Sequence, residues 1–266
     1  MLKTGLIALS LALAVPAQAA LDWDAALSGE HRSEKNAARD EYRHPRETLE
    51  FFGLREGMTV VELSPGGGWY TEVLAPLMAD NGRYYAAHGS VNGGAYARRS
   101  LGSYLVKLGE DDDTYGRVMV SELSPPNAMA IAPEGSADLV LAFRNIHTWM
   151  RAGVLDEVLE SVFAALKPGG VFGVVQHRGP EGNSIDDMKN TAYVTEDYVI
   201  SAVEAAGFTL ADRSEVNANP KDTADYENGV WTLPPSLTLG DEDRERYLAI
   251  GESDRMTLKF TKPAAE

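Results

Sequence analysis

Cysteine is absent from the 266-residue sequence. Disulfide bonds and thiolate metal sites are therefore excluded, which is compatible with an oxidising compartment but does not require one. Histidine is also scarce. Any chemistry that depends on an imidazole must use one of five residues, namely His31, His44, His88, His147 and His177.

Basic residues are few relative to acidic ones. The chain has 24 lysines and arginines against 40 aspartates and glutamates, and its formal net charge is −16. An acidic surface repels the phosphates of nucleic acids and the headgroups of anionic membranes, so we expect neither as a partner. The excess of negative charge is typical of a soluble protein, and a small-molecule substrate is the class of ligand that we expect.

Long apolar runs are missing as well. The run Leu6–Val15 is about ten residues long, which is too short to span a bilayer as a helix. Lys3 precedes this run, Pro16 interrupts it, and Ala17–Ala19 supplies the small residues that a signal peptidase requires. The pattern predicts a cleavable signal peptide over residues 1–19, with a buried N-terminal helix as the alternative.

The remaining residues, 20–266, are expected to be periplasmic or secreted. No later segment approaches about 18 unbroken apolar residues, so we expect no membrane insertion after the signal peptide is removed. The hydrophobic content of 44% is enough for one sizeable core. A single domain is therefore predicted.

Segments with strand-like and helix-like patterns alternate along most of the chain. Strands are expected at 58–63, 83–87, 117–121, 137–143, 171–176, 208–216 and 256–261. Helices are expected between them, at 69–78, 96–108, 154–166 and 195–206. This order predicts an α/β fold with a doubly wound, mostly parallel, seven-stranded sheet of the Rossmann-like type.

Two segments fall outside the expected core of residues 45–216 and 256–261. Helix formers in 32–52 are interrupted at His44–Pro45, which predicts a helical N-terminal extension with a break at the proline. Residues 217–255 are rich in turn formers and predict an irregular insertion before the last strand. The part around Trp231 is interpreted either as a lid over a ligand site or as a plain surface embellishment.

The most informative segment is Val60–Gly68, in which a buried strand runs into a glycine-rich turn that a helix follows at once. Glycine lets the backbone turn sharply and lets a ligand approach without a Cβ in the way. The free N–H groups at the start of the helix suit a nucleotide-like ligand at the carboxyl end of the sheet. An ordinary tight turn is the alternative.

This turn resembles the first motif of class I S-adenosylmethionine (SAM) dependent methyltransferases, an acid-x-Gly-x-Gly-x-Gly loop. Glu62, Gly66 and Gly68 match the motif, while Ser64 replaces its first glycine. The resemblance extends over about residues 45–216 and implies the class I methyltransferase fold.

Further motifs follow in the family's order. Residues 137–141 resemble the fourth strand, 143–147 resemble the segment after that strand in quinone-type C-methyltransferases, and 165–171 resemble the "LKPGG" turn. The whole chain, particularly 42–45 and 251–256, is most similar to an exported bacterial group of predicted methyltransferases. That similarity implies no particular substrate.

The resemblance implies SAM as the cofactor and does not require a metal. It assigns cofactor contacts to Glu62, Ser64, Gly66, Gly67, Gly68, Tyr70, His88 and Arg144. One position departs from the family, in which an acid at the end of the second strand accepts hydrogen bonds from both ribose hydroxyls. His88 stands there instead, and an imidazole offers at most one acceptor.

Three of the histidines, His88, His147 and His177, fall at or just past the carboxyl ends of predicted strands. Because those ends line one crevice in a doubly wound fold, we interpret the cluster as a general base or as a metal site of neutral imidazoles. Hydrogen bonds from each ring to loop backbone are the alternative. The candidate catalytic residues are Asn145, His147, His177 and Arg178.

The sequence leaves three functions open. The first is a SAM-dependent methyltransferase that acts on an unidentified small molecule in the cell envelope, where methyl transfer needs in-line positioning and, for some acceptors, a base. The second is an exported, non-catalytic protein that keeps the fold to bind a small ligand. The third is an enzyme with a histidine-dependent metal site.

We predict that the mature chain begins near Ala20 or Leu21. A signal peptidase cuts after small residues, so N-terminal sequencing of the protein from a periplasmic extract should start at one of these positions. Soluble cytoplasmic protein that still carries Met1 would contradict the prediction.

Overall fold

The computed structural model describes residues 20–264, and the expected signal peptide at 1–19 lies outside this part of the chain. The strands are β1 (Thr59–Leu63), β2 (Arg83–His88), β3 (Met119–Glu122), β4 (Ala137–Phe143), β5 (Leu166–His177), β6 (Thr209–Ser214) and β7 (Arg255–Thr261). They form one seven-stranded sheet in the order β3-β2-β1-β4-β5-β7-β6. Pairing is parallel except that β7, inserted between β5 and β6, is antiparallel to both. The predicted fold class is confirmed.

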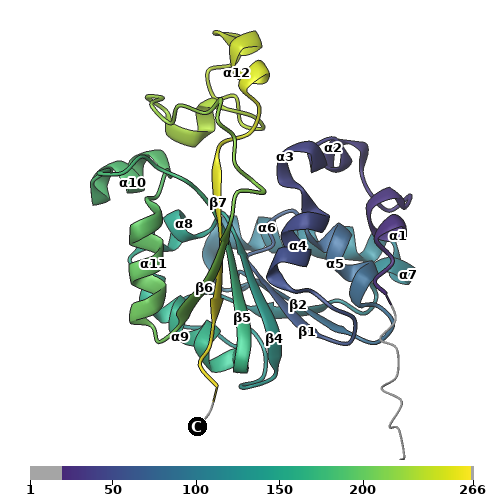
Figure 1. The fold of residues 1–266 in the computed structure, drawn as a ribbon. Helices are drawn as coiled ribbons and strands as arrows, with labels where there is room; N and C mark the ends of the chain where they lie inside the picture. The colour runs from purple at the N-terminus through teal and green to yellow at the C-terminus, as the bar shows by residue number, and fades with distance from the viewer. Residues whose placement is uncertain (1–19, 265–266) are drawn as a thin grey trace, which may run out of the picture.

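Helices cover both faces of the sheet (Figure 1). One face carries α8 (Ile146–Ala152), α9 (Leu155–Ala165), α10 (Ile185–Thr191) and α11 (Glu196–Ala205). The other carries α1 (Trp23–Ser28), α4 (Pro45–Phe52), α5 (Thr71–Met78), α6 (Gly94–Glu110) and α7 (Asp112–Tyr115). Side chains alternate along each strand, so Val61 packs into one core and Val60 into the other. None of the helices in residues 20–264 combines the length and apolar character that a membrane crossing needs.

The carboxyl ends of the parallel strands meet at one edge of the sheet. The last residue of β5, His177, lies beside the start of β7, because it pairs with Arg255. Two segments stand over this edge, at the top in Figure 1: the insertion before β7, and the helices α2 (Glu34–Ala37) and α3 (Asp40–Arg43). Ligands of doubly wound sheets bind at this edge, so both segments are placed to cover a site.

The N-terminal extension is helical and breaks where the sequence predicts. His44 has a left-handed backbone (φ +40°) between α3 and α4, and Pro45 is the first residue of α4. Proline suits the first helical position because the N–H that it lacks has no partner there. The break allows the short helices α2 and α3 to turn towards the carboxyl edge of the sheet.

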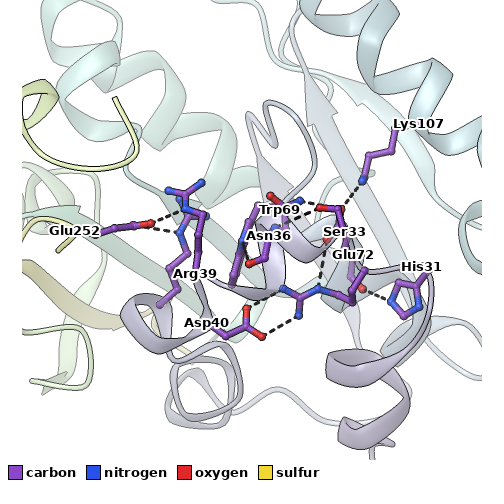
Figure 2. A network of polar contacts seen from close by, with 11 residues as sticks. His31, Ser33, Asn36, Arg39, Asp40, Trp69, Glu72, Lys107 and Glu252 are labelled. Carbon is purple, nitrogen blue, oxygen red and sulfur yellow. Dashed lines mark hydrogen bonds and ion pairs between the residues drawn. The ribbon is translucent and has the colours of Figure 1, made fainter. Parts of the chain in front are cut away.

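A buried carboxylate on α5 fastens this extension to the sheet (Figure 2). Glu72 is fully buried and accepts hydrogen bonds from Lys107 Nζ at 2.5 Å and from Asn36 Nδ2 at 2.8 Å. Arg32 Nε lies 3.3 Å from the same carboxylate, and the Arg32 guanidinium also pairs with Asp40 at 2.8 Å. Two carboxylates therefore meet two cations, and the charges of this network balance.

The "LKPGG" segment differs from the prediction. It was expected as a turn before a strand at 171–176, but β5 already begins at Leu166. Ala137 of β4 pairs with Leu166, and Leu139 pairs with Val171, so residues 167–170 bulge out of the ladder. The turn chemistry of proline and glycine is therefore accommodated as a bulge inside the strand.

The insertion is more ordered than its composition predicts. It contains the 3₁₀ helix η1 (Gly229–Thr232) and the helix α12 (Arg244–Ile250). It also has a small apolar core of its own, in which Tyr226, Val230 and Tyr247 pack against Tyr193. The insertion is consequently held in a defined position over the edge of the sheet.

We predict that Glu72→Ala lowers the free energy of unfolding by about 3–5 kcal/mol, because it removes the buried carboxylate that pairs with Lys107 and leaves Arg32 with Asp40 alone. The matched control is Glu50→Ala, which breaks only the exposed pair with Arg46 and should change stability by about 0.5 kcal/mol or less. Urea denaturation of the mature chain measures both. Equal losses in the two variants would contradict the role of Glu72.

Candidate functional site

A cavity of about 410 Å³ opens at the carboxyl edge of the sheet, within the size range of small-molecule sites. The residues that follow β1, β4 and β5 form its floor, and the N-terminal helices and the insertion form its walls. Nine of the residues that the sequence proposed line it, namely Glu62, Ser64, Gly66, Gly67, Tyr70, Arg144, Asn145, His147 and His177. Gly68, His88 and Arg178 lie outside this lining.

The glycine-rich turn presents bare backbone to the cavity. Ser64 follows β1 with φ +50°, and its N–H donates to the Ala87 carbonyl at 2.9 Å. A Cβ added at Gly66 or Gly67 would meet no atom of the described residues within 4 Å. Gly66 also has φ +60°, which favours glycine. The turn therefore leaves room for a ligand against its backbone.

Gly68 is placed differently from its neighbours in the turn. A Cβ added there would lie 3.1 Å from Tyr104 Cε2 and 3.1 Å from Lys107 Cδ, both on α6. Side chains of α6 thus occupy the space over Gly68. The structure places this residue in helix packing, where the sequence pattern assigns a cofactor contact.

His88 ends β2 and lies behind the turn. Its Nε2 is 3.4 Å from the Gly66 carbonyl oxygen and 3.4 Å from Ser100 Oγ. Its Nδ1 is buried and has no hydrogen-bond partner among the described residues. Burial lowers the pKa of His88, so the ring is neutral at pH 7. It supports the turn and leaves one buried polar atom available.

Arg178 follows β5 but is occupied by carboxylates outside the cavity. Its guanidinium pairs with Glu215 at 2.7 Å and with Asp254 at 2.8 Å. These pairs hold β5 next to the segment that enters β7. The structure therefore gives Arg178 a bracing position and does not bring it together with Asn145 and the two cavity histidines.

His147 and His177 face the same cavity, with ring centroids 5.6 Å apart. His177 Nδ1 lies 2.5 Å from Ser253 Oγ, and His147 Nδ1 lies 3.2 Å from Gln176 Nε2. Burial lowers the pKa of His147 to about 4. Burial also lowers the pKa of His177 well below its usual value, and the charges of His147 and Arg144 lower it further. Both imidazoles are neutral at pH 7.

The three strand-end histidines do not come together. His88 lies behind the glycine-rich turn, away from His147 and His177. Between residues 20 and 264, no group of three or more histidine, aspartate or glutamate side chains is arranged to hold a metal ion. The proposed three-histidine metal site is therefore not formed.

Glu62 is a buried acid at the end of β1. It accepts a hydrogen bond from the Tyr84 hydroxyl, which also contacts Thr71 Oγ1 at 2.9 Å. Burial raises the pKa of Glu62 to about 7, although the hydrogen bonds from Tyr84 and Thr71 oppose the rise. The acid that matches the first motif is thus partly protonated near neutral pH.

The basic part of the wall is not among the residues predicted from the sequence. Glu252 Oε1 lies 2.5 Å from Arg39 Nε, and Oε2 lies 2.8 Å from Arg255 Nη2 and 3.4 Å from Arg43 Nε. Burial acts to raise the pKa of Glu252, but these arginines hold it at about 2. Figure 2 shows Arg39 reaching Glu252 from the N-terminal extension. The four-residue spacing of Arg39 and Arg43 was the available signal, since it places both on one helical face.

Aromatic side chains complete the cavity. Tyr70 stacks on Phe143 with ring centroids 3.5 Å apart and planes within 7°. The Arg43 guanidinium lies 4.5 Å from the centre of the Trp69 ring. Trp231 of η1 lines the cavity from the insertion, so this segment covers the site and is not a remote embellishment.

Comparison with known proteins shows the fold. Neither a protein-family profile nor a curated protein sequence matches the chain. A SAM-dependent methyltransferase from Aquifex aeolicus matches with a TM-score of 0.56 and 18% identity over 85% of this chain and 93% of its own. The [4+2]-cyclase SpnF matches with a TM-score of 0.60 and 16% identity over 94% and 88%. A possible exported protein from Bordetella parapertussis matches with a TM-score of 0.51 and 17% identity over 85% and 68%. The chain thus has the Rossmann-like fold of class I SAM-dependent methyltransferases.

We predict that Glu62→Gln stabilises the protein at about pH 8 and has little effect at about pH 4.5. The folded-state pKa of about 7 lies above the ordinary value of 4.5, so the folded state binds the proton more tightly. Wild-type stability therefore falls as pH rises between these values, by about 3 kcal/mol at most. Thermal melting of both proteins across this range measures the effect, and a difference that does not vary with pH would contradict it.

Proposed function

We propose that this protein is a SAM-dependent methyltransferase that acts on a small molecule. The observation that carries the proposal is the bare backbone of Gly66 and Gly67, which faces a cavity between the carboxyl ends of β1 and β4. In a doubly wound sheet, nucleotide-like ligands bind in this position. The fold shared with methyltransferase structures supports the same function.

The residues around the turn fit SAM. Ser64, Gly66 and Gly67 would hold it through backbone groups. Asn145 Nδ2 donates to the Leu63 carbonyl at 2.9 Å and so fixes the end of β4 against the end of β1. His88 stands at the end of β2, where the family has its ribose-binding acid; its buried Nδ1 has no hydrogen-bond partner within the described chain, but the residue lies outside the cavity lining.

The chain's own contribution to methyl transfer is to position the acceptor and to take up a proton where the acceptor carries one. SAM, when bound, supplies a methyl group on an electrophilic sulfonium. Gln176 Nε2 lies 3.2 Å from His147 Nδ1; if this amide donates, the His147 proton is on Nε2 and can be donated to a ligand. If His177 donates its Nδ1–H to Ser253, its Nε2 is free to accept a proton. His177 is therefore the candidate base.

A non-catalytic ligand-binding protein is the second candidate. It is favoured by His88, which replaces the acid that would bind both ribose hydroxyls. The fold does not decide between the two, because one structural neighbour is described as a [4+2]-cyclase.

We also propose that the protein works outside the cytoplasm. The support is the signal-peptide pattern in residues 1–19, together with a structural neighbour described as a possible exported protein. This location would require a source of cofactor in the cell envelope.

We predict that S-adenosylhomocysteine stabilises the mature chain and that Gly67→Val abolishes the effect. At a hundred times the dissociation constant the gain is about 2.7 kcal/mol, which is several degrees in melting temperature. Valine at this position projects into the cavity, and its Cβ contacts no described atom, so the fold should persist. Gly102→Val on α6 is the matched control, because a Cβ there is equally unobstructed by residues 20–264.

Two results would count against the proposal. If neither SAM nor S-adenosylhomocysteine changes the wild-type melting temperature, the methyltransferase function fails and the ligand-binding protein becomes the better account. If Gly67→Val keeps the full shift while remaining folded by circular dichroism, the cofactor does not lie against the turn.

A further inference from the structure

Four arginines lie together at the wall of the cavity, and three of them pair with one carboxylate. We call Arg39, Arg43, Arg144 and Arg255 the arginine cluster; three of them line the cavity, and Arg255 lies behind them. Glu252 is the acid that pairs with the cluster. Against Glu252 the four positive charges leave an excess of three when Glu62, the other acid of the lining, is protonated, and of two when it is ionised, in a chain whose formal net charge is −16.

Several donors of the cluster are unused. Nη2 of Arg39 and Nη2 of Arg43 are buried, and neither has a hydrogen-bond partner within the described chain. Arg43 is only 3% exposed. The Arg144 side chain forms no hydrogen bond or ion pair with any residue between 20 and 264, and it reaches the cavity from the end of β4. Buried donors are nearly always paired in folded proteins, so these atoms indicate a missing acceptor.

The excess of buried positive charge over negative charge is found at the cavity wall and not in the other arginine pairs described above. In the network around Glu72, the part of Figure 2 that lies outside the cluster, two carboxylates meet two cations, and the buried Arg32 Nε that lacks a hydrogen bond still faces Glu72 Oε2 at 3.3 Å. Outside the cavity, Arg178 meets both Glu215 and Asp254. Where this protein buries arginine for structural reasons, it supplies matching carboxylates.

The guanidinium groups of the arginine cluster repel one another. Burial lowers the pKa of Arg144 to about 10, and Arg255 lowers it further than any other charge. Burial also lowers the pKa of Arg43, with Arg144 as the next cause. Arg144 has in addition a left-handed backbone, with φ +64°, and such strain is concentrated at functional sites. A bound anion would relieve the repulsion.

We propose that the methyl acceptor is an acidic small molecule whose carboxylate or phosphate group is bound by the arginine cluster. Guanidinium groups bind both kinds of anion through paired, charge-assisted hydrogen bonds. That the bound anion is the methyl acceptor depends on the methyltransferase function proposed above. The existence of the anion site does not depend on that function. Arg144, assigned to the cofactor by its place in the sequence, becomes an acceptor-binding residue.

The strand order favours the acceptor as the ligand of the cluster. The glycine-rich turn follows β1, and β2 flanks β1 on the side of His88. Arg144 follows β4 and Arg255 begins β7, which both lie on the opposite side of β1. A nucleoside that extends from the turn towards β2 therefore leaves the cluster free for a second ligand.

The same arrangement connects the anion to the candidate base. After burial, the causes that lower the pKa of His177 are the charges of His147, Arg144, Arg255 and Arg43. An anion on the cluster would offset the repulsion from these arginines. The acceptor would thus strengthen the imidazole that takes its proton.

The test uses the mature chain with inorganic phosphate and benzoate as anionic probes. Benzamide, an uncharged analogue of benzoate, is the control, and all measurements are made at the same ionic strength. We expect both anions to raise the melting temperature in a saturable way and benzamide to have no effect. Arg144→Gln should weaken binding of both anions at least tenfold in calorimetry. Because it relieves repulsion, it should not lower the melting temperature of the free protein.

Two further variants complete the test. Arg213→Gln removes the same charge from the exposed pair with Glu196 and should bind both anions as the wild type does. If Arg144→Gln does not fold, Arg39→Lys serves instead, because it keeps the charge but loses the planar fork, and it should also weaken binding. No saturable effect of either anion on the wild type, or wild-type affinity in the cluster variants, would overturn the proposal.

S-adenosylhomocysteine separates the acceptor from the cofactor. We expect its stabilising effect to add to that of phosphate and to be the same in Arg144→Gln and the wild type. Competition with phosphate, or a tenfold loss in Arg144→Gln, would assign the arginines to the cofactor's own carboxylate and overturn the proposal. If both anions bind as expected but S-adenosylhomocysteine does not, the methyltransferase function fails and the anion site stands.

Discussion

The carboxylate of Glu252 is the group on which the site depends. It joins Arg39 and Arg43 of the N-terminal extension to Arg255 at the start of β7, so both flanking segments are fixed over the carboxyl edge of the sheet. Its pKa of about 2 keeps it ionised at neutral pH despite burial. Without this charge the walls of the cavity would bring only like charges together in a buried space, which is strongly unfavourable.

Much of the fold and the floor of the site could be predicted because both follow from local patterns. Apolar runs mark the strands, β4 has the predicted bounds, and Pro45 marks the break between α3 and α4. Candidate side chains at or just after the ends of β1, β4 and β5 necessarily meet at one edge of a parallel sheet. The walls depend on contacts between distant residues. Arg39 and Glu252 are 213 positions apart, and no periodicity connects them.

The glycine-rich turn shows a second limit of local patterns. Gly67 and Gly68 are neighbours in the same motif, yet one faces the cavity and the other packs against Tyr104 of α6. Both roles favour the same residue type, because α6 leaves little room for a Cβ at Gly68 and a ligand against the turn would leave little at Gly67. Only the position of a later helix separates them. Likewise, α12 was missed because residues around it are dominated by turn formers, and it is held by the insertion's own apolar core.

The placement of β7 has a consequence for the order in which the molecule is completed. β6 pairs with β7 in the sheet, although β7 comes last in the sequence. A chain that leaves a ribosome or an export channel N-terminus first can pair β1 to β5 early. Until residues 252–261 have emerged, Arg39 and Arg43 lack their partner Glu252, and β6 lacks its neighbouring strand β7. A partly emerged chain therefore has the glycine-rich turn but lacks the part of the cavity wall that Glu252 and the start of β7 supply.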